Sequence, residues 1–272
     1  ERNASLCQSG HGVVERFLVP YRRPFGNYAP CSPGRITLPM KRQASSPVAL
    51  LPHATMNQNI LFDHARAARI ELPEAVFCEG KPLNAVVELL RTLGKGSGRP
   101  VLFTRLAPEV FAQAPEAVRN NYDYHPLSRT AYGETLPVNT RGKVAVVSAG
   151  TADGSVAWEA ARTLPYLGIT HALFEDCGVA GLWRLSERLP EINTFDAVIV
   201  VAGLDAALAS VMGGLTPKPI FGVPTSVVYG VAQGGNAALA SMLASCAPGV
   251  GSMNIDNGYG AACAAARVVN GK

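Results

Sequence analysis

The 272-residue chain is poor in charged residues, which make up only 16% of it. Its net charge of +4 comes from residues 1–55, where seven Lys and Arg oppose two Asp and Glu, so the remaining residues carry −1. A nearly neutral globular part gives little electrostatic support for nucleic-acid binding. The chain also lacks an apolar run of the roughly 20 residues that a spanning helix needs, so we expect no membrane segment.

Cysteine is also scarce, and its spacing excludes two common roles. The six cysteines form no CxxC pair and no metal-ligand pattern, and the chain is too long for a small disulfide scaffold. We therefore expect reduced thiols in a soluble, cytoplasmic protein. The Walker phosphate-binding loop and the GxGxxG dinucleotide fingerprint are absent as well.

Residues 1–55 are expected to form a disordered leader, separate from the folded protein. The segment is basic and rich in Pro, Ser and Arg, a composition that disfavours a packed core. Transit peptides share its few acids and its Arg and Ser, but the dispersed prolines and the lack of an amphipathic run argue against targeting. We favour Met56 as the natural start, with the preceding residues spurious.

Residues 56–140 are predicted to form a small α+β domain. A strand at 74–78 precedes an amphipathic helix at 83–93, whose apolar residues recur at close to helical spacing. A glycine-rich turn and a second strand within 100–106 follow. A polar link at 120–129 then leads to the next domain.

Residues 141–272 are predicted to form an α/β domain with a doubly wound parallel sheet. Short β-branched runs, apolar on both faces, alternate with helical stretches, as in a sheet that helices cover on both sides. The expected strands lie within 143–150, 171–176, 196–203 and 219–225, with a candidate fifth at 249–255. The expected helices are 155–167, 180–189, 204–212 and 236–245.

Ligands of such sheets bind beyond the carboxyl ends of the strands, where polar residues collect in this sequence. The turn SAGTADGS holds Thr151, Asp153 and Ser155, which suit either a phosphate at a helix N-terminus or an ordinary turn capped by Asp153. Asp176 and Asp205 follow the next two strands. Each suits either ligand or proton chemistry, or simple stabilisation of a helix N-terminus.

Cys246 lies in the stretch LASCAPG, between a helical run of small residues and a Pro-Gly break. It is either a buried structural thiol or a nucleophile. A helix C-terminus does not favour a thiolate, so a nucleophilic role requires a nearby cation or a positively charged substrate. Upstream, Gly234 and Gly235 allow close approach of a ligand, and the small residues that follow also suit a subunit interface.

The ordered set of motifs resembles the LarB family, pyridinium-3,5-biscarboxylic acid mononucleotide synthases of nickel-pincer cofactor biosynthesis. The motifs are DHARAARIELPEAVFCEGK, SAGTADGSVAWEAA, DCGVAGLWRL, VVAGLDAALASVMGGL, VPTSVVYG and SCAPGVGSMNIDNGYGAA. The resemblance covers residues 56–268. It implies a flavodoxin-like, PurE-like domain similar to the purine-pathway aminoimidazole ribonucleotide carboxylase.

The resemblance also implies a reaction. The pyridinium ring of nicotinic acid adenine dinucleotide is carboxylated with CO2, and the phosphoanhydride is hydrolysed to release AMP. No organic cofactor is implied; CO2 or bicarbonate is the co-substrate, and the carboxylates permit Mg²⁺ without establishing it. Neither nucleic acid nor a membrane is an expected partner, and the family suggests a dimer-based homo-oligomer such as an octamer.

By the same resemblance, Cys246 is the nucleophile and Asp205 the carboxylate that accepts a proton or activates water. Asp205 replaces a glutamate common in the family, Trp183 replaces a histidine expected in many relatives, and the turn TADGS departs from TSDLP. The implied substrate-binding residues are Thr151, Asp153, Ser155, Asp176, Thr225, Ser226, Tyr229, Gly234, Gly235, Asn254, Asp256 and Asn257.

Two other functions fit the sequence less well. One is a purine-pathway carboxylase or mutase acting on aminoimidazole ribonucleotide, which needs no covalent thiol and should survive Cys246→Ser. The other is a nucleotide-binding module without catalysis. The joint presence of Cys246, Asp205 and Asp153 argues against this second alternative.

Overall fold

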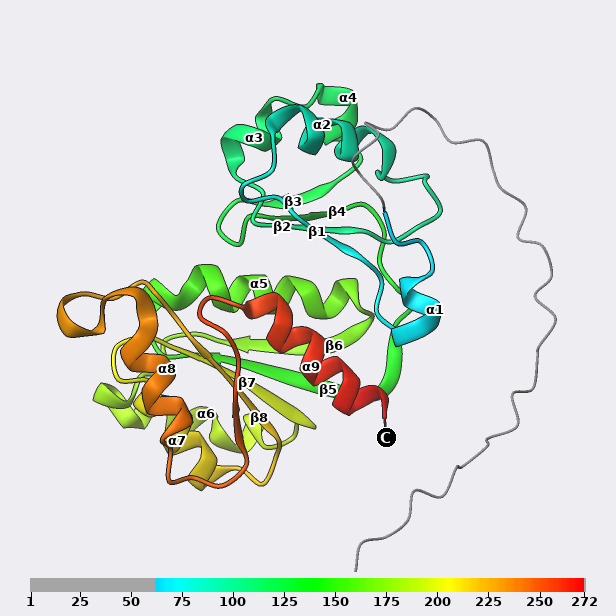
Figure 1. Cartoon of the computed structure of the whole chain (residues 1–272). Coiled ribbons are helices and arrows are strands. Elements are labelled where there is room, and N and C mark those ends of the chain that lie inside the picture. Colours follow the sequence, from blue (N-terminus) through cyan, green and yellow to red (C-terminus); the bar gives the residue numbers. More distant parts are fainter. Residues whose placement is uncertain (1–61, 272) are drawn as a thin grey trace, which may run out of the picture. The chain divides into compact units, whose positions relative to one another are not determined.

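The computed structural model describes residues 62–271, which belong to one compact unit. The leader expected at 1–55 lies outside the described residues. The described residues form two sheets: β1 to β4 come before residues 133–138 in the chain, and β5 to β9 come after them (Figure 1). The domain boundary near residue 140 stays a prediction. No helix within 62–271 combines the length and apolar character required to cross a bilayer.

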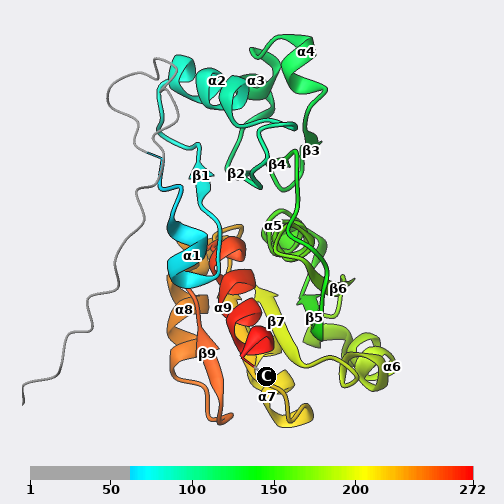
Figure 2. The same cartoon turned by 90° about the vertical axis from the view of Figure 1, so that its right-hand side faces the viewer.

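The first sheet has the strand order β1-β2-β4-β3, with β1 and β2 parallel and the other pairs antiparallel. Helices α2, α3 and α4 lie together on one side of it (Figure 2). The apolar face of α2, which carries Val86, Leu89 and Leu90, packs in one core with Phe103 of β2. The elements of this part are α1 (Arg66–Ile70), β1 (Ala75–Phe77), α2 (Leu83–Thr92), β2 (Leu102–Thr104), α3 (Pro108–Ala112), α4 (Glu116–Arg119), β3 (Asp123–His125) and β4 (Thr130–Tyr132).

The second sheet confirms the predicted doubly wound parallel architecture. Its strand order is β6-β5-β7-β8-β9, and every neighbouring pair is parallel, which is the flavodoxin-like order. The candidate fifth strand is present as β9. The strands are β5 (Asn139–Ser148), β6 (Ile169–Phe174), β7 (Ala197–Ala202), β8 (Ile220–Pro224) and β9 (Val250–Ser252). The helices are α5 (Gly154–Tyr166), α6 (Leu182–Ile192), α7 (Ala207–Leu215), α8 (Asn236–Leu243) and α9 (Gly258–Asn270), with short 3-10 turns at Thr151–Asp153, Val179–Gly181 and Gly230–Gly235.

Helices cover both faces of this sheet because its strands are apolar on both sides. Val144 and Val146 of β5 lie in one core with α5 and α9, whereas Ala145 and Val147 lie in the other with α6, α7 and α8. Figure 1 shows α5 and α9 on one side of the sheet and α6 and α7 on the other. The alternation follows from the period of two along a strand. Both faces are thus closed to solvent, and the strand ends are left for ligands.

The structure corrects three sequence-based expectations. The polar link at 120–129 contains β3, which pairs with β4 in a hairpin. Helix α9 was not predicted, because its start, GYGAAC, is rich in glycine and small residues that give no helical hydrophobic pattern. Helix α7 begins at Ala207 rather than 204, because Leu204 and Ala206 adopt positive φ in the turn after β7.

Candidate functional site

Residues with a strained backbone conformation cluster at the carboxyl edge of the five-stranded sheet. Four non-glycine residues beyond the strand ends have positive φ: Asp176 after β6, Leu204 and Ala206 after β7, and Asp256 after β9. Each such residue costs about 1–3 kcal/mol, and such residues cluster at functional sites. This edge is also where doubly wound sheets bind ligands, so both arguments point to the same place.

Asp153 and Thr225 connect the ends of β5 and β8 below the surface of this edge. Both residues are buried, and the Thr225 hydroxyl donates to Oδ1 of Asp153 at 2.6 Å while the N–H of Gly150 donates to Oδ2 at 2.9 Å. Burial raises the pKa of Asp153, and the Thr225 hydroxyl opposes that shift. Gly203 passes so close that a Cβ there would lie 2.6 Å from the Thr225 oxygen. The hydrogen bond between Asp153 and Thr225 therefore holds the loops after β5 and β8 together beneath the surface of this edge.

Ser226 and Asp256 form a second pair at the same edge. The Ser226 N–H and hydroxyl donate to the two carboxylate oxygens of Asp256 at 2.8 and 2.5 Å. The N–H of Asp256 in turn donates to the carbonyl of Pro224 at 2.8 Å. These bonds hold the loop after β9 against the end of β8.

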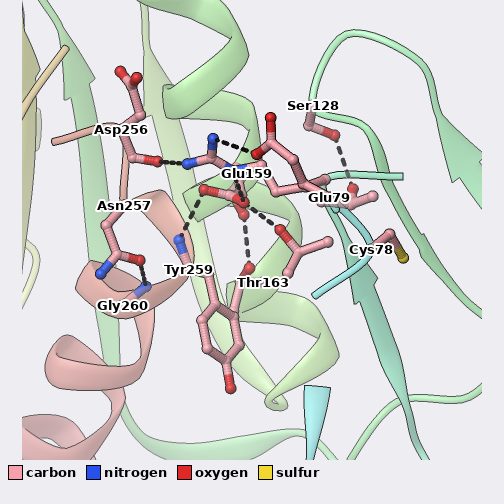
Figure 3. Close-up of polar contacts among 12 residues, drawn as sticks. Cys78, Glu79, Ser128, Glu159, Thr163, Asp256, Asn257, Tyr259 and Gly260 are labelled. Atoms are coloured by element: carbon pink, nitrogen blue, oxygen red, sulfur yellow. Dashed lines mark hydrogen bonds and ion pairs between the residues drawn. The ribbon is translucent and has the colours of Figure 1, made fainter. Parts of the chain in front are cut away.

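Arg105 lies directly after β2 and reaches this edge through a polar network. Figure 3 shows Glu79, Glu159 and Asp256 of this network. Its guanidinium donates to the backbone carbonyl of Asp256, and its Nε lies 3.6 Å from Oε1 of Glu159. Glu159 is buried on α5, where it accepts from the Thr104 hydroxyl and from the N–H of Tyr259 at 3.2 Å. Burial raises the pKa of Glu159, whereas the Thr104 hydroxyl and the Arg105 charge favour its ionised form.

A pocket of about 110 Å³ lies among these groups. It is lined by Arg105, Ser128, Arg129, Ser155, Val156, Glu159, Ser226, Val227 and Asp256. Three residues predicted from the sequence, Ser155, Ser226 and Asp256, therefore meet in one cavity. A larger hollow of about 570 Å³, lined by residues 95, 120–123 and 132–135, includes no predicted site residue. The smaller pocket is the better candidate because the strained and buried polar groups surround it.

Two predicted acids at the edge have local partners. The exposed Asp205 accepts a hydrogen bond from the N–H of Ala207 at 3.3 Å, so it caps the start of α7. Asp176 pairs with Arg184 at 2.5 Å. Both positions remain open to solvent, so these contacts leave room for a ligand role.

The remaining predicted residues lie in loops of the same edge. Asn257 caps α9 by accepting from the N–H of Gly260 at 2.8 Å, and Asn254 accepts from the N–H of its neighbour Ile255 at 2.9 Å. The side chains of Thr151 and Tyr229 are exposed. Gly234 and Gly235 both have φ of +79°, and a Cβ at Gly235 would lie 2.9 Å from the Thr225 carbonyl oxygen. This close contact is sufficient to require glycine at position 235, so the glycine is not evidence for a bound ligand.

Cys246 lies away from the pocket. Its exposed side chain sits in the connection between α8 and β9, so it is not a buried structural thiol. Because β9 runs parallel to β8 and begins opposite Ile220, the first residue of β8, this connection lies at the amino edge of the sheet. One chain therefore does not bring Cys246 and the carboxyl-edge pocket together.

Comparison with known proteins identifies the family. Residues 57–135 match a LarB/PurE-like N-terminal domain, and residues 143–272 match AIR carboxylase. An uncharacterized protein from Methanocaldococcus jannaschii is 31% identical over 215 residues, which cover 76% of this chain and 82% of that relative. The chain belongs to the LarB family. The AIR carboxylase domain indicates a carboxylase-type enzyme.

Both LarB-family segments contribute to the pocket. Arg105, Ser128 and Arg129 come from the N-terminal match, and the other lining residues come from the AIR carboxylase match. The pocket is therefore a joint product of the two segments. Trp183, which departs from the family pattern, is 64% exposed on α6 and does not line the pocket.

The sequence reasoning missed Arg105, Arg129 and Glu159. Arg105 falls within the predicted strand stretch 100–106, and the structure ends β2 at Thr104, so Arg105 lies at a carboxyl strand end. Glu159 is the single acid within α5, a helix otherwise rich in small and apolar residues. A lone acid on such a helix needs a buried partner, which is the signal that could have found it. We see no comparable local signal for Arg129.

Mg²⁺ has no preformed protein cage in the described part of the chain, where no three His, Cys, Asp or Glu side chains gather. The oxygens of Asp153 already accept hydrogen bonds inside the protein. The exposed carboxylate of Asp205 would hold a divalent ion together with substrate phosphates, which is how Mg²⁺ is commonly bound. Such an ion supplies charge neutralisation for phosphate chemistry.

Proposed function

We propose that this LarB-family protein carboxylates the pyridinium ring of nicotinic acid adenine dinucleotide with CO2 and hydrolyses its phosphoanhydride. The products are pyridinium-3,5-biscarboxylic acid mononucleotide and AMP, the first step of nickel-pincer cofactor synthesis. The observation that carries the proposal is the exposed thiol of Cys246 in a chain that joins a LarB-type N-terminal segment to an AIR carboxylase domain.

The chemistry requires a nucleophile because a pyridinium ring is electron-poor and does not attack CO2. The Cys246 thiolate adds to the ring carbon beside the target carbon, and the ring electrons move to the nitrogen. The resulting neutral dihydropyridine contains an enamine, whose carbon forms the new bond to CO2. A carboxylate then takes the ring proton, the C–S bond breaks, and its electrons return to sulfur. Covalent catalysis of this kind divides one difficult step into easier ones.

Asp205 is the proposed proton acceptor. Its carboxylate is exposed at the carboxyl edge, bonded only weakly to the N–H of Ala207 at 3.3 Å, and so is available to a ligand. It is one methylene shorter than the glutamate common in the family, so its reach depends on how closely the ring approaches. Water then attacks the phosphoanhydride, and AMP leaves.

We further propose that the active unit contains more than one copy of the chain. Cys246 lies at the amino edge of the sheet and Asp205 at its carboxyl edge, so a neighbouring copy of the chain has to supply one of the two to each active site. Large apolar side chains near Cys246 support a contact of this kind: Leu243 is 70% exposed and Leu215 is 40% exposed. Closely packed apolar contact of this type drives most stable oligomers.

The substrate is tested by offering two candidates to the purified full chain with isotopically labelled bicarbonate. We expect label in a carboxylated pyridinium mononucleotide, together with AMP, when nicotinic acid adenine dinucleotide is supplied. We expect no labelled product from aminoimidazole ribonucleotide. Label in carboxyaminoimidazole ribonucleotide alone would favour the purine-pathway alternative, which is tested because the chain matches AIR carboxylase. No labelled product from either substrate would contradict the proposed activity.

A further inference from the structure

We propose that the carboxyl-edge pocket is a subsite for one phosphoryl group of the substrate, with Arg129 as its principal cation. The inference rests on the proposed function only for the identity of the whole substrate. The binding of phosphate itself is argued from the pocket and is tested without turnover.

The size of the pocket restricts what it can hold. Its volume of about 110 Å³ is well above the roughly 10–15 Å³ that one buried water molecule needs on the same measure. It admits a small polyatomic group. A phosphoryl or carboxylate group is the right size.

Three residues that line the pocket have a strained backbone conformation. Arg105, Arg129 and Asp256 line it, and their φ values are +56°, +52° and +55°. The left-handed region costs an arginine or an aspartate free energy, because Cβ crowds the carbonyl. Three such residues converge from the end of β2, the turn before β4 and the loop before α9. Strain concentrated in one small cavity is typical of a ligand site.

The charges are arranged so that one cation remains free. Arg105 is occupied: it lies 3.5 Å from Glu79 and 3.6 Å from Glu159, and it donates to the Asp256 carbonyl. Within residues 62–271, the Arg129 guanidinium forms no ion pair and donates no hydrogen bond. Arg129 lines the pocket, and an unpaired, half-buried guanidinium is suited to an anion, because its planar fork binds phosphate or carboxylate through two hydrogen bonds.

The two acids of the pocket are already engaged by internal donors. Both oxygens of Asp256 accept from Ser226. One oxygen of Glu159 accepts from the Thr104 hydroxyl and the other from the N–H of Tyr259. These hydrogen bonds stabilise part of the negative charge of both acids, so the repulsion that an incoming anion meets is reduced.

A second donor, from α5, favours a tetrahedral phosphoryl group over a planar carboxylate. The Ser155 hydroxyl has no partner among the described residues and lines the pocket from the first turn of α5, beside Val156. A carboxylate is satisfied by a single guanidinium fork. Donors from two elements, the guanidinium of Arg129 and the hydroxyl of Ser155, suit the oxygens of a phosphoryl group better than a single fork does.

The test measures binding of inorganic pyrophosphate and of nicotinate to the full-length protein by isothermal titration calorimetry at fixed ionic strength. The variants are Arg129→Gln, Arg129→Lys and, as a matched control, Arg91→Gln, which removes an exposed arginine of α2 outside the pocket. We expect Arg129→Gln to weaken pyrophosphate binding about tenfold, in line with the loss of a charge-assisted hydrogen-bond pair. Arg129→Lys should retain part of the affinity, and Arg91→Gln should bind as the wild type does.

The outcomes separate this inference from the proposed function. Equal pyrophosphate affinity in Arg129→Gln and Arg91→Gln would overturn the subsite, as would a wild type that binds no pyrophosphate. A variant that loses nicotinate binding but keeps pyrophosphate binding would instead make the pocket a carboxylate site. If the wild type fails to carboxylate nicotinic acid adenine dinucleotide but binds pyrophosphate through Arg129, the proposed reaction fails and the subsite stands.

Discussion

Substitution of Gly258 by alanine tests the packing on which the pocket depends. Gly258 begins α9 where that helix crosses α5. A Cβ there would meet the carbonyl oxygen of Val156 and would lie 2.9 Å from the backbone nitrogen of Ala160. Both obstacles are backbone atoms of α5, so a side-chain rotation cannot relieve them. The two helices would have to separate, and Tyr259, whose N–H binds Glu159, would move with them.

The expected cost follows from the geometry. Overpacking a close contact costs about 1–3 kcal/mol, and a clash with rigid backbone belongs at the upper end of that range. In a chain of this length, each kcal/mol shifts Tm by about 2–4 °C. We therefore expect Gly258→Ala to lower Tm by about 4–12 °C. Pyrophosphate affinity should fall as well, because Val156 and Glu159 line the pocket.

Gly214→Ala is the matched control. Gly214 lies in α7, and a Cβ there meets nothing within 4 Å. Alanine has the higher helix propensity, so this variant should be as stable as the wild type or up to about 1 kcal/mol more stable. Thermal unfolding followed by circular dichroism compares the three proteins. A Gly258→Ala variant that melts with or above the wild type would refute the packing argument.

Other groups give predictions of their own. Burial raises the pKa of Glu159 above its ordinary value of 4.5. As the pH rises above about 4.5, the unfolded state therefore releases this proton before the native state does. Over this range the wild type should lose stability relative to Glu159→Gln. Urea unfolding of both proteins across this range checks the trend, and a pH-independent difference would contradict it. Thr225→Val removes the hydroxyl that donates to a buried oxygen of Asp153 and should cost about 1–3 kcal/mol in urea unfolding. Thr151→Val, at an exposed position, should change stability by less than about 0.5 kcal/mol, and equal effects of the two substitutions would be inconsistent with the buried pair. Cys246→Ser should remove one fast-reacting thiol per chain in a titration of the native protein with a thiol reagent; an unchanged fast phase would speak against exposure of this cysteine.

The sequence was sufficient to predict the parallel sheet because its strands are short, β-branched and apolar on both faces. The same periodicity placed the predicted site residues after strands, so Ser155, Ser226 and Asp256 do meet at one edge. Their meeting follows from the rule that parallel strands end at a common edge. Local pattern and global topology agree at these positions.

The parts that sequence reasoning missed depend on long-range packing. The contact between Arg105 and the Asp256 carbonyl joins residues 151 positions apart, and no local pattern encodes such a pairing. Helix α9 was missed because small residues that allow close packing on α5 weaken the hydrophobic periodicity of the helix itself. The position of Cys246 at the amino edge follows from the register of β9, a strand of three residues that the sequence marks only weakly.

The central claim is that the Cys246 thiol adds to the substrate ring, and one measurement tests it most directly. Wild-type protein and Cys246→Ser are incubated with nicotinic acid adenine dinucleotide and labelled bicarbonate, and label in the ring is followed by mass spectrometry. Cys263→Ser, a half-buried thiol of α9, is the control. We predict labelled carboxylated mononucleotide from the wild type and from Cys263→Ser, and none from Cys246→Ser. Carboxylation at the wild-type rate by Cys246→Ser would contradict the account.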